Sequence, residues 1–177
     1  FLPLAVSPVG HPDLRFTTPS GKVEFVSSRA EAAGLPALPV YEPPREHGPA
    51  SPHAARYPLV FCQGRAITHF HGFYDHGRAL PSLAAADPEP RLWINPADAT
   101  ARNITDGVPI RIVNDRGAMT AAARVTDRVP PGVVWMHDGW EGINRLTSGA
   151  RSVPDAAARV SAGGSASYEA RVEVTPA

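Results

Sequence analysis

The chain has 177 residues, and its 17 basic and 17 acidic side chains balance to a formal net charge of zero. This balance argues against a general nucleic-acid binder, which needs an excess of cations to displace phosphate counterions. The hydrophobic content of 43% is typical of a packed globular domain. No apolar run approaches the roughly 20 residues that span a bilayer, and the single cysteine, Cys62, excludes an internal disulfide framework.

The sequence begins at Phe1 with neither an initiator methionine nor a signal-like segment, so we expect it to be a piece of a longer protein. Any targeting signal would then lie upstream. We expect a cytoplasmic location, and leave the periplasm open for that reason.

Residues 1–56 are predicted to form an extended lead-in that contains one short strand and one short helix. The alternation of polar and apolar residues over 22–26 indicates the strand. Ser27 or Ser28 is a suitable N-cap for a helix over 29–33, which Gly34 would end. The prolines between 36 and 44 then favour an extended path, and residues 45–56 are predicted to be a surface loop.

Residues 57–177 are predicted to form a second domain of short strands separated by glycine- and proline-rich turns. A short helix is expected after Asn95, because asparagine is a good N-cap and Pro96 suits the first helical position. This pattern of many short strands with few helices is mainly β and suggests a closed barrel. The strands are predicted at 57–63, 92–94, 110–113, 118–126, 133–136 and 170–174.

The residues after the first of these strands have the chemistry of a binding site. Gly64 allows the backbone to approach a ligand closely, and the planar guanidinium of Arg65 suits phosphate oxygens. An ordinary surface turn explains the same two residues. His69 and His71 would lie on one face of an extended segment, and with His76 they could instead hold a metal ion.

Three later segments carry polar or aromatic groups with less specific meaning. Asp138 and Trp140 follow the strand over 133–136, and Asn144 lies in a segment predicted to be a polar loop, where its amide could pair with a heterocycle. Tyr168 precedes the last strand. It could contact a ligand, and an aromatic side chain at the barrel rim with no ligand explains it equally well. The sequence has no glycine-rich phosphate loop and no nucleophile elbow. The residues thus favour a barrel with a polar rim for a large anionic ligand.

The order of several motifs resembles the C-terminal region of the molybdopterin oxidoreductases, the dimethyl sulfoxide reductase superfamily, which includes formate dehydrogenases and nitrate reductases. Asn103 stands where that superfamily usually has glycine, and asparagine tolerates the left-handed backbone that such a turn needs. The resemblance covers about residues 16–175 and rests on the ordered combination of 16–25, 38–41, Gly64-Arg65 with His69, 95–126 and 144–147.

The resemblance implies a double-psi β-barrel, also called an aspartate-decarboxylase-like barrel, that binds molybdopterin guanine dinucleotide. It implies no catalytic residue and no metal ligand in this chain: molybdenum or tungsten would be carried by the full-length enzyme. The partners would be the upstream domains of that enzyme and its redox subunits, and the isolated chain would be inactive. Carried over by position, the cofactor-binding residues are Gly64, Arg65, His69, His71, Asp138, Trp140, Asn144, Thr147 and Tyr168.

Two other readings stay open at this point. One is a small metal-dependent enzyme that uses His69, His71 and His76. The other is a structural barrel with no ligand of its own.

Overall fold

The structure is a computed structural model that describes residues 9–41, 43–48, 50–68, 80–149, 168 and 170–177. Contacts divide the chain into two compact units. One contains Phe1–Tyr41 with Val153–Gly163, and the other contains Glu42–Ser152 with Gly164–Ala177. This division concerns compactness alone, and the domain boundary predicted after residue 56 stays a prediction.

The first unit contains helix α1, Ser28–Ala32. Its N-cap is Ser27, whose hydroxyl accepts a hydrogen bond from the amide of Ala30, and Gly34 follows with φ at +75°, so both helix ends form as predicted. The strand predicted over 22–26 is wrong, because these residues lie in bends and irregular backbone. Among the described residues no strand lies beside this alternating segment, and Phe25 is 83% exposed.

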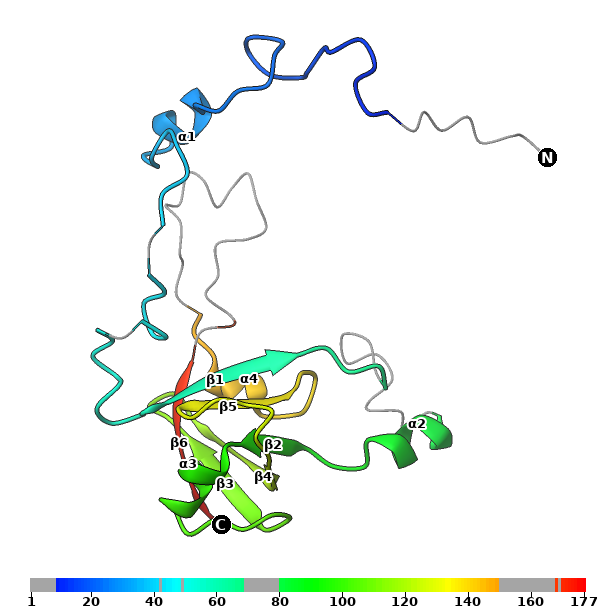
Figure 1. Cartoon of the computed structure of the whole chain (residues 1–177), viewed down its shortest axis with the longest axis vertical. Coiled ribbons are helices and arrows are strands. Elements are labelled where there is room, and N and C mark those ends of the chain that lie inside the picture. The colour runs from blue at the N-terminus through cyan, green and yellow to red at the C-terminus, as the bar shows by residue number, and fades with distance from the viewer. Residues whose placement is uncertain (1–8, 42, 49, 69–79, 150–167, 169) are drawn as a thin grey trace, which may run out of the picture. The chain divides into compact units, whose positions relative to one another are not determined.

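The described part of the second unit forms a closed barrel of six strands in the order β1-β5-β2-β4-β3-β6. The pairs β1·β5 and β2·β4 are parallel and the other neighbours are antiparallel. Figure 1 shows how the strands wrap around one core. The strands are β1 Leu59–Gly64, β2 Arg91–Ile94, β3 Pro109–Val113, β4 Ala118–Val125, β5 Val133–His137 and β6 Arg171–Pro176.

The order of the strands has an internal two-fold pattern that confirms the predicted double-psi class. β2, a short helix, β3 and β4 are matched by β5, a short helix, β6 and β1. Each set contributes one parallel pair. The two sets meet along the antiparallel β2·β5 pair, where Trp93 lies opposite Trp135, and along the antiparallel β3·β6 pair.

The barrel interior is filled by every second residue of the strands, as the pleat of a strand requires. Each such Leu, Ile or Phe stabilises the fold by roughly 1.5–3 kcal/mol through burial. This alternation is why the six predicted barrel strands are all found close to their expected positions. The largest fully buried side chains are Leu59, Phe61, Leu92, Ile94, Ile110, Ile112, Val134, Met136, Leu146, Val172 and Val174.

Helix α3, Pro96–Thr100, begins as predicted. The Asn95 side chain accepts a hydrogen bond of 3.0 Å from the amide of Ala97 and donates one of 2.8 Å to the carbonyl of Val129. Asn103 then adopts φ of +56°, so it keeps the left-handed turn expected of it.

Two short helices were not expected from the sequence: α2, Pro81–Ala86, and α4, Ile143–Leu146. The prediction of a polar loop at 144–148 is therefore wrong at its start. Ile143 and Leu146 are buried and Asn144 is exposed, which is one helical turn with an apolar side. A single turn is too short to show a 3.6-residue period. Within the described residues, no helix combines the length and the hydropathy needed to cross a membrane.

Candidate functional site

One end of the barrel, here called the mouth, gathers connections from distant parts of the chain. β1 and β5 are parallel and finish together, with Gly64 paired to His137. β2 is antiparallel to β5 and β6 is antiparallel to β1, so both start at this end; β4 is parallel to β2 and starts there too. The predicted site residues that the structure describes all end β1, follow β1, follow β5 or precede β6: Gly64, Arg65, Asp138, Trp140, Asn144, Thr147 and Tyr168.

These residues differ in how much of them a ligand could reach. Arg65 and Asn144 are exposed, Asp138 and Thr147 are half-buried, and Tyr168 is 68% exposed. Trp140 is 9% exposed and belongs to the hydrophobic core. His69 and His71, together with His76 of the metal-site alternative, lie outside the described residues.

A backbone hydrogen bond joins the two loops at the ends of β1 and β5. The amide of Asp138 donates to the carbonyl of Gly64 at 2.8 Å. The loop that carries Arg65 and the loop that carries Asp138 are therefore adjacent.

In the structure, glycine is needed at position 64 for a reason other than the expected one. A Cβ at this position would lie 2.7 Å from Cζ2 of the Trp135 indole, so the glycine makes room for that ring. The sequence alone predicts that a glycine here lets the backbone approach a ligand. Here the space beside its Cα is filled by protein.

Helix α4, which carries Asn144, packs closely on the start of β4. A Cβ on Gly142, with φ of +100°, would lie 2.8 Å from Cβ of Met119. A Cβ on Gly117 would lie 3.0 Å from Cβ of Arg145. Two glycines thus allow α4 to lie directly against the barrel at the mouth.

A polar cluster at the mouth was missed from the sequence. One carboxylate oxygen of Asp87 lies 3.1 Å from the hydroxyl of Thr68, which donates to it, and 3.4 Å from Nδ1 of His137. The ring of His137 also meets Trp135 edge to face, with centroids 5.0 Å apart. Asp87 lies at the C-terminal end of helix α2, which the sequence does not predict, so the sequence gives no reason to single it out. His137 directly follows the strand predicted over 133–136, and that position could have marked it as a site residue.

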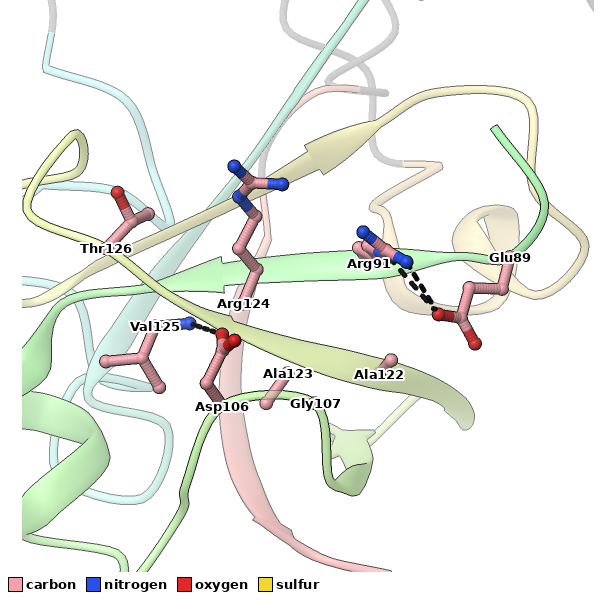
Figure 2. Close-up of a pocket in the computed structure, with 9 residues that line it drawn as sticks. All are labelled: Glu89, Arg91, Asp106, Gly107, Ala122, Ala123, Arg124, Val125 and Thr126. Atoms are coloured by element: carbon pink, nitrogen blue, oxygen red, sulfur yellow. Dashed lines mark hydrogen bonds and ion pairs between the residues drawn. The ribbon is translucent and has the colours of Figure 1, made fainter. Parts of the chain in front are cut away.

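A pocket of about 320 Å³ lies elsewhere, beside β2 and β4 (Figure 2). Two pairs of its lining residues bind each other: Arg91 pairs with Glu89 at 3.1 Å, and Asp106 accepts a hydrogen bond from the amide of Val125 at 2.8 Å. None of the predicted cofactor-binding residues lines it. The mouth, where Arg65 and Asn144 are exposed, has the better chemistry for a large anionic ligand.

The structure also bears on the other chemistry considered from the sequence. Burial raises the pKa of the Cys62 thiol, which disfavours the reactive thiolate, as expected for a cysteine inside a strand. The described part of the chain has no group of three or more His, Cys, Asp and Glu side chains that could hold a metal ion.

Comparisons with known proteins match this chain to parts of much larger ones. A family model described as the molydopterin dinucleotide binding domain matches residues 59–161, more than half of the chain. Dimethyl sulfoxide reductase DmsA of Haemophilus influenzae is 36% identical over 143 residues, which are 75% of this chain and 17% of that protein. The dimethyl sulfoxide/trimethylamine N-oxide reductase of Cereibacter sphaeroides is 40% identical over 127 residues, 69% of this chain and 15% of that protein.

Among solved structures, acetylene hydratase from Pelobacter acetylenicus aligns with a TM-score of 0.70 at 22% identity. The alignment covers 93% of this chain and 24% of the hydratase, and at this identity it shows a shared fold alone. The chain thus spans about a sixth of the length of the two curated relatives.

Proposed function

Because the chain belongs to the molydopterin dinucleotide-binding domain family, we propose that its barrel mouth binds the guanine form of the cofactor, molybdopterin guanine dinucleotide. The family membership confirms the resemblance inferred from the motifs. The observation that supports the proposed site is topological: strand pairing brings Arg65, Asp138 and Asn144 to one end of the barrel from separate parts of the sequence.

The donors and acceptors at the mouth fit such a ligand. The exposed guanidinium of Arg65 can form paired hydrogen bonds with pyrophosphate oxygens. The Asn144 amide and the Thr147 hydroxyl can pair with the edge of a pterin or guanine, and Asp138 can accept from ring N–H groups. Trp140 is in the core, so its role would be to support the loop that holds Asp138.

The cofactor supplies the redox-active metal centre, molybdenum or tungsten, when it is bound in the whole enzyme. The residues of this chain would bind the dinucleotide, orient it and exclude water from it. The parent protein would be an oxidoreductase resembling the dimethyl sulfoxide reductases, with its upstream domains holding the rest of the cofactor. Redox partner subunits and the cytoplasmic location stay predictions.

The test is cofactor retention in the full-length parent enzyme. We expect Arg65→Ala to reduce the amount of guanine nucleotide released per polypeptide on acid hydrolysis by about tenfold or more, since a charged hydrogen bond of ~1.5–3 kcal/mol is lost. Arg111→Ala is the matched control, because Arg111 is an exposed arginine in the middle of β3. Equal nucleotide content in Arg65→Ala and the wild type would contradict the role given to Arg65.

A further inference from the structure

The carbonyl of Leu146, the last residue of α4, accepts two side-chain hydrogen bonds from the turn between β3 and β4. Nδ2 of Asn114 donates at 2.7 Å, and Nε of Arg116 donates at 2.9 Å. Asn114 is only 7% exposed and also donates to the carbonyl of Arg171 at 3.1 Å. The end of α4 is therefore tied to this turn, one residue before Thr147.

Arg116 is itself held in place by Glu46. Its two terminal nitrogens, Nη1 and Nη2, each lie 2.8 Å from a different carboxylate oxygen of Glu46. The side chain of Glu46 is 12% exposed and that of Arg116 is 32% exposed, so the carboxylate is shielded from water and the guanidinium partly so. A paired contact of this kind fixes the plane of the guanidinium. The direction of Nε toward Leu146 follows from that plane.

The segment around Glu46 is fastened to the barrel in turn by Arg171 at the start of β6. Arg171 is 8% exposed, and its Nε donates to the carbonyl of Glu46 at 2.6 Å. Its terminal nitrogens donate to the carbonyls of Pro58 at 2.9 Å and His47 at 3.2 Å. A continuous set of contacts thus runs from β6 through Glu46 and Arg116 to the end of α4.

Helix α4 depends on such outside contacts for its geometry. It has four residues, and its N-cap, Gly142, provides no side-chain hydrogen bond. A helix this short is not stable by itself in water. The orientation of Asn144 and Thr147 therefore depends on the residues that contact the helix.

We propose that Arg116, clamped by Glu46, is a positioning residue for cofactor binding: it holds the Leu146 carbonyl and thereby sets the orientation of Asn144 and Thr147. This inference rests on the proposed function of the mouth. It also gives Glu46, which the sequence places in the lead-in, a role in the cofactor site.

The test compares two arginine-to-lysine variants of the full-length parent enzyme. In Arg116→Lys the charge opposite Glu46 is kept, but one ammonium cannot bind both carboxylate oxygens and the Leu146 carbonyl. The matched control is Arg102→Lys. Nε of Arg102 lies 2.5 Å from Glu173, and the two side chains are 16% and 29% exposed, so this is also a partly shielded arginine–carboxylate pair. Arg102 donates hydrogen bonds to Glu173 and to the carbonyl of Asp98, and neither residue belongs to α4.

We expect both variants to lower the melting temperature, and only Arg116→Lys to release cofactor faster. The expected increase in the release rate is about tenfold, measured well below both melting temperatures, since loss of a shielded charged contact acts mainly on dissociation. Glu46→Gln serves as a second variant that removes the clamp without touching Leu146, and should release cofactor faster in the same way. Hydrogen exchange of peptides covering residues 143–149, in enzyme made without cofactor, should rise in Arg116→Lys and Glu46→Gln only.

The possible outcomes separate this inference from the proposed function. If Arg116→Lys and Arg102→Lys release cofactor at the same rate while Asn144→Ala and Arg65→Ala lose it, Arg116 only stabilises the barrel and the inference is overturned. If Asn144→Ala and Arg65→Ala retain cofactor as well as the wild type does, the proposed site fails first. Faster release confined to Arg116→Lys and Glu46→Gln supports the positioning role.

Discussion

The contact between Gly64 and Trp135 illustrates how one residue type can serve a purpose other than the one its position suggests. At the sequence level, a glycine after a strand and before an arginine indicates close approach of a ligand. In the structure, the indole of Trp135 occupies the space a Cβ would need. Which side chain of a neighbouring strand lies beside Gly64 depends on how the two strands are aligned. That alignment cannot be predicted from Gly64 and Arg65 alone.

We therefore expect Gly64→Ala to destabilise the barrel, because the added methyl would lie 2.7 Å from Trp135. The expected loss in the free energy of unfolding is about 1–3 kcal/mol, as for other overpacked sites. Urea denaturation followed by tryptophan fluorescence measures it. Gly149→Ala is the control, since no atom lies within 4 Å of a Cβ there, and its midpoint should match the wild type. Equal midpoints for both variants would show that Trp135 moves aside without penalty.

At the scale of secondary structure, the sequence predicts elements well where burial alternates along them. The six barrel strands were found for this reason, and α3 was found because Asn95 and Pro96 mark its start. The residues over 22–26 show the limit of the same rule, since their alternation has no partner strand in the part of the chain that the structure describes. α4 shows the opposite case, an element that forms although the sequence does not predict it. A helix of one turn is held by its contacts with the barrel, and it is too short to show a helical repeat in its sequence.

The N-cap of α3 gives a prediction at this scale. Asn95→Ala removes both the hydrogen bond to the amide of Ala97 and the one to the carbonyl of Val129. We expect a loss of about 1–2 kcal/mol in barrel stability, the upper part of the range for N-cap substitutions. Ser27→Ala removes the cap of α1 in the other compact unit and should leave the unfolding of the barrel unchanged. A loss in Ser27→Ala as large as in Asn95→Ala would contradict this assignment.

At the scale of the whole molecule, the proposed site depends on strand order. The pattern of short strands predicted a closed barrel, and the resemblance supplied the set of residues expected to bind the cofactor. The physical reason they meet is the parallel pairing of β1 with β5, strands far apart in the sequence. The Asp87–His137 contact and the Glu46–Arg116 pair could not be predicted, because each joins segments whose proximity depends on this closed order.

Two truncations test where the barrel begins. Removal of residues 1–41 should leave barrel unfolding unchanged, since the two compact units separate at that point. Removal of residues 1–56 should destabilise the barrel by about 3–5 kcal/mol, because Arg171 and Arg116 would lose shielded partners around Glu46. Chemical denaturation of the two truncated chains and the intact chain gives the comparison. Equal stability of the two truncated chains would favour the boundary predicted after residue 56.

The position of β6 in the ring has a consequence for how the molecule assembles. β6 pairs with both β1 and β3, so without it each of those strands has an open edge. During synthesis, the residues of the first five strands therefore leave the ribosome before the ring can close. Until residues 171–176 follow, the edges of β1 and β3 have unpaired backbone groups. Completion of the mouth thus waits until the last strand of the barrel has been synthesised.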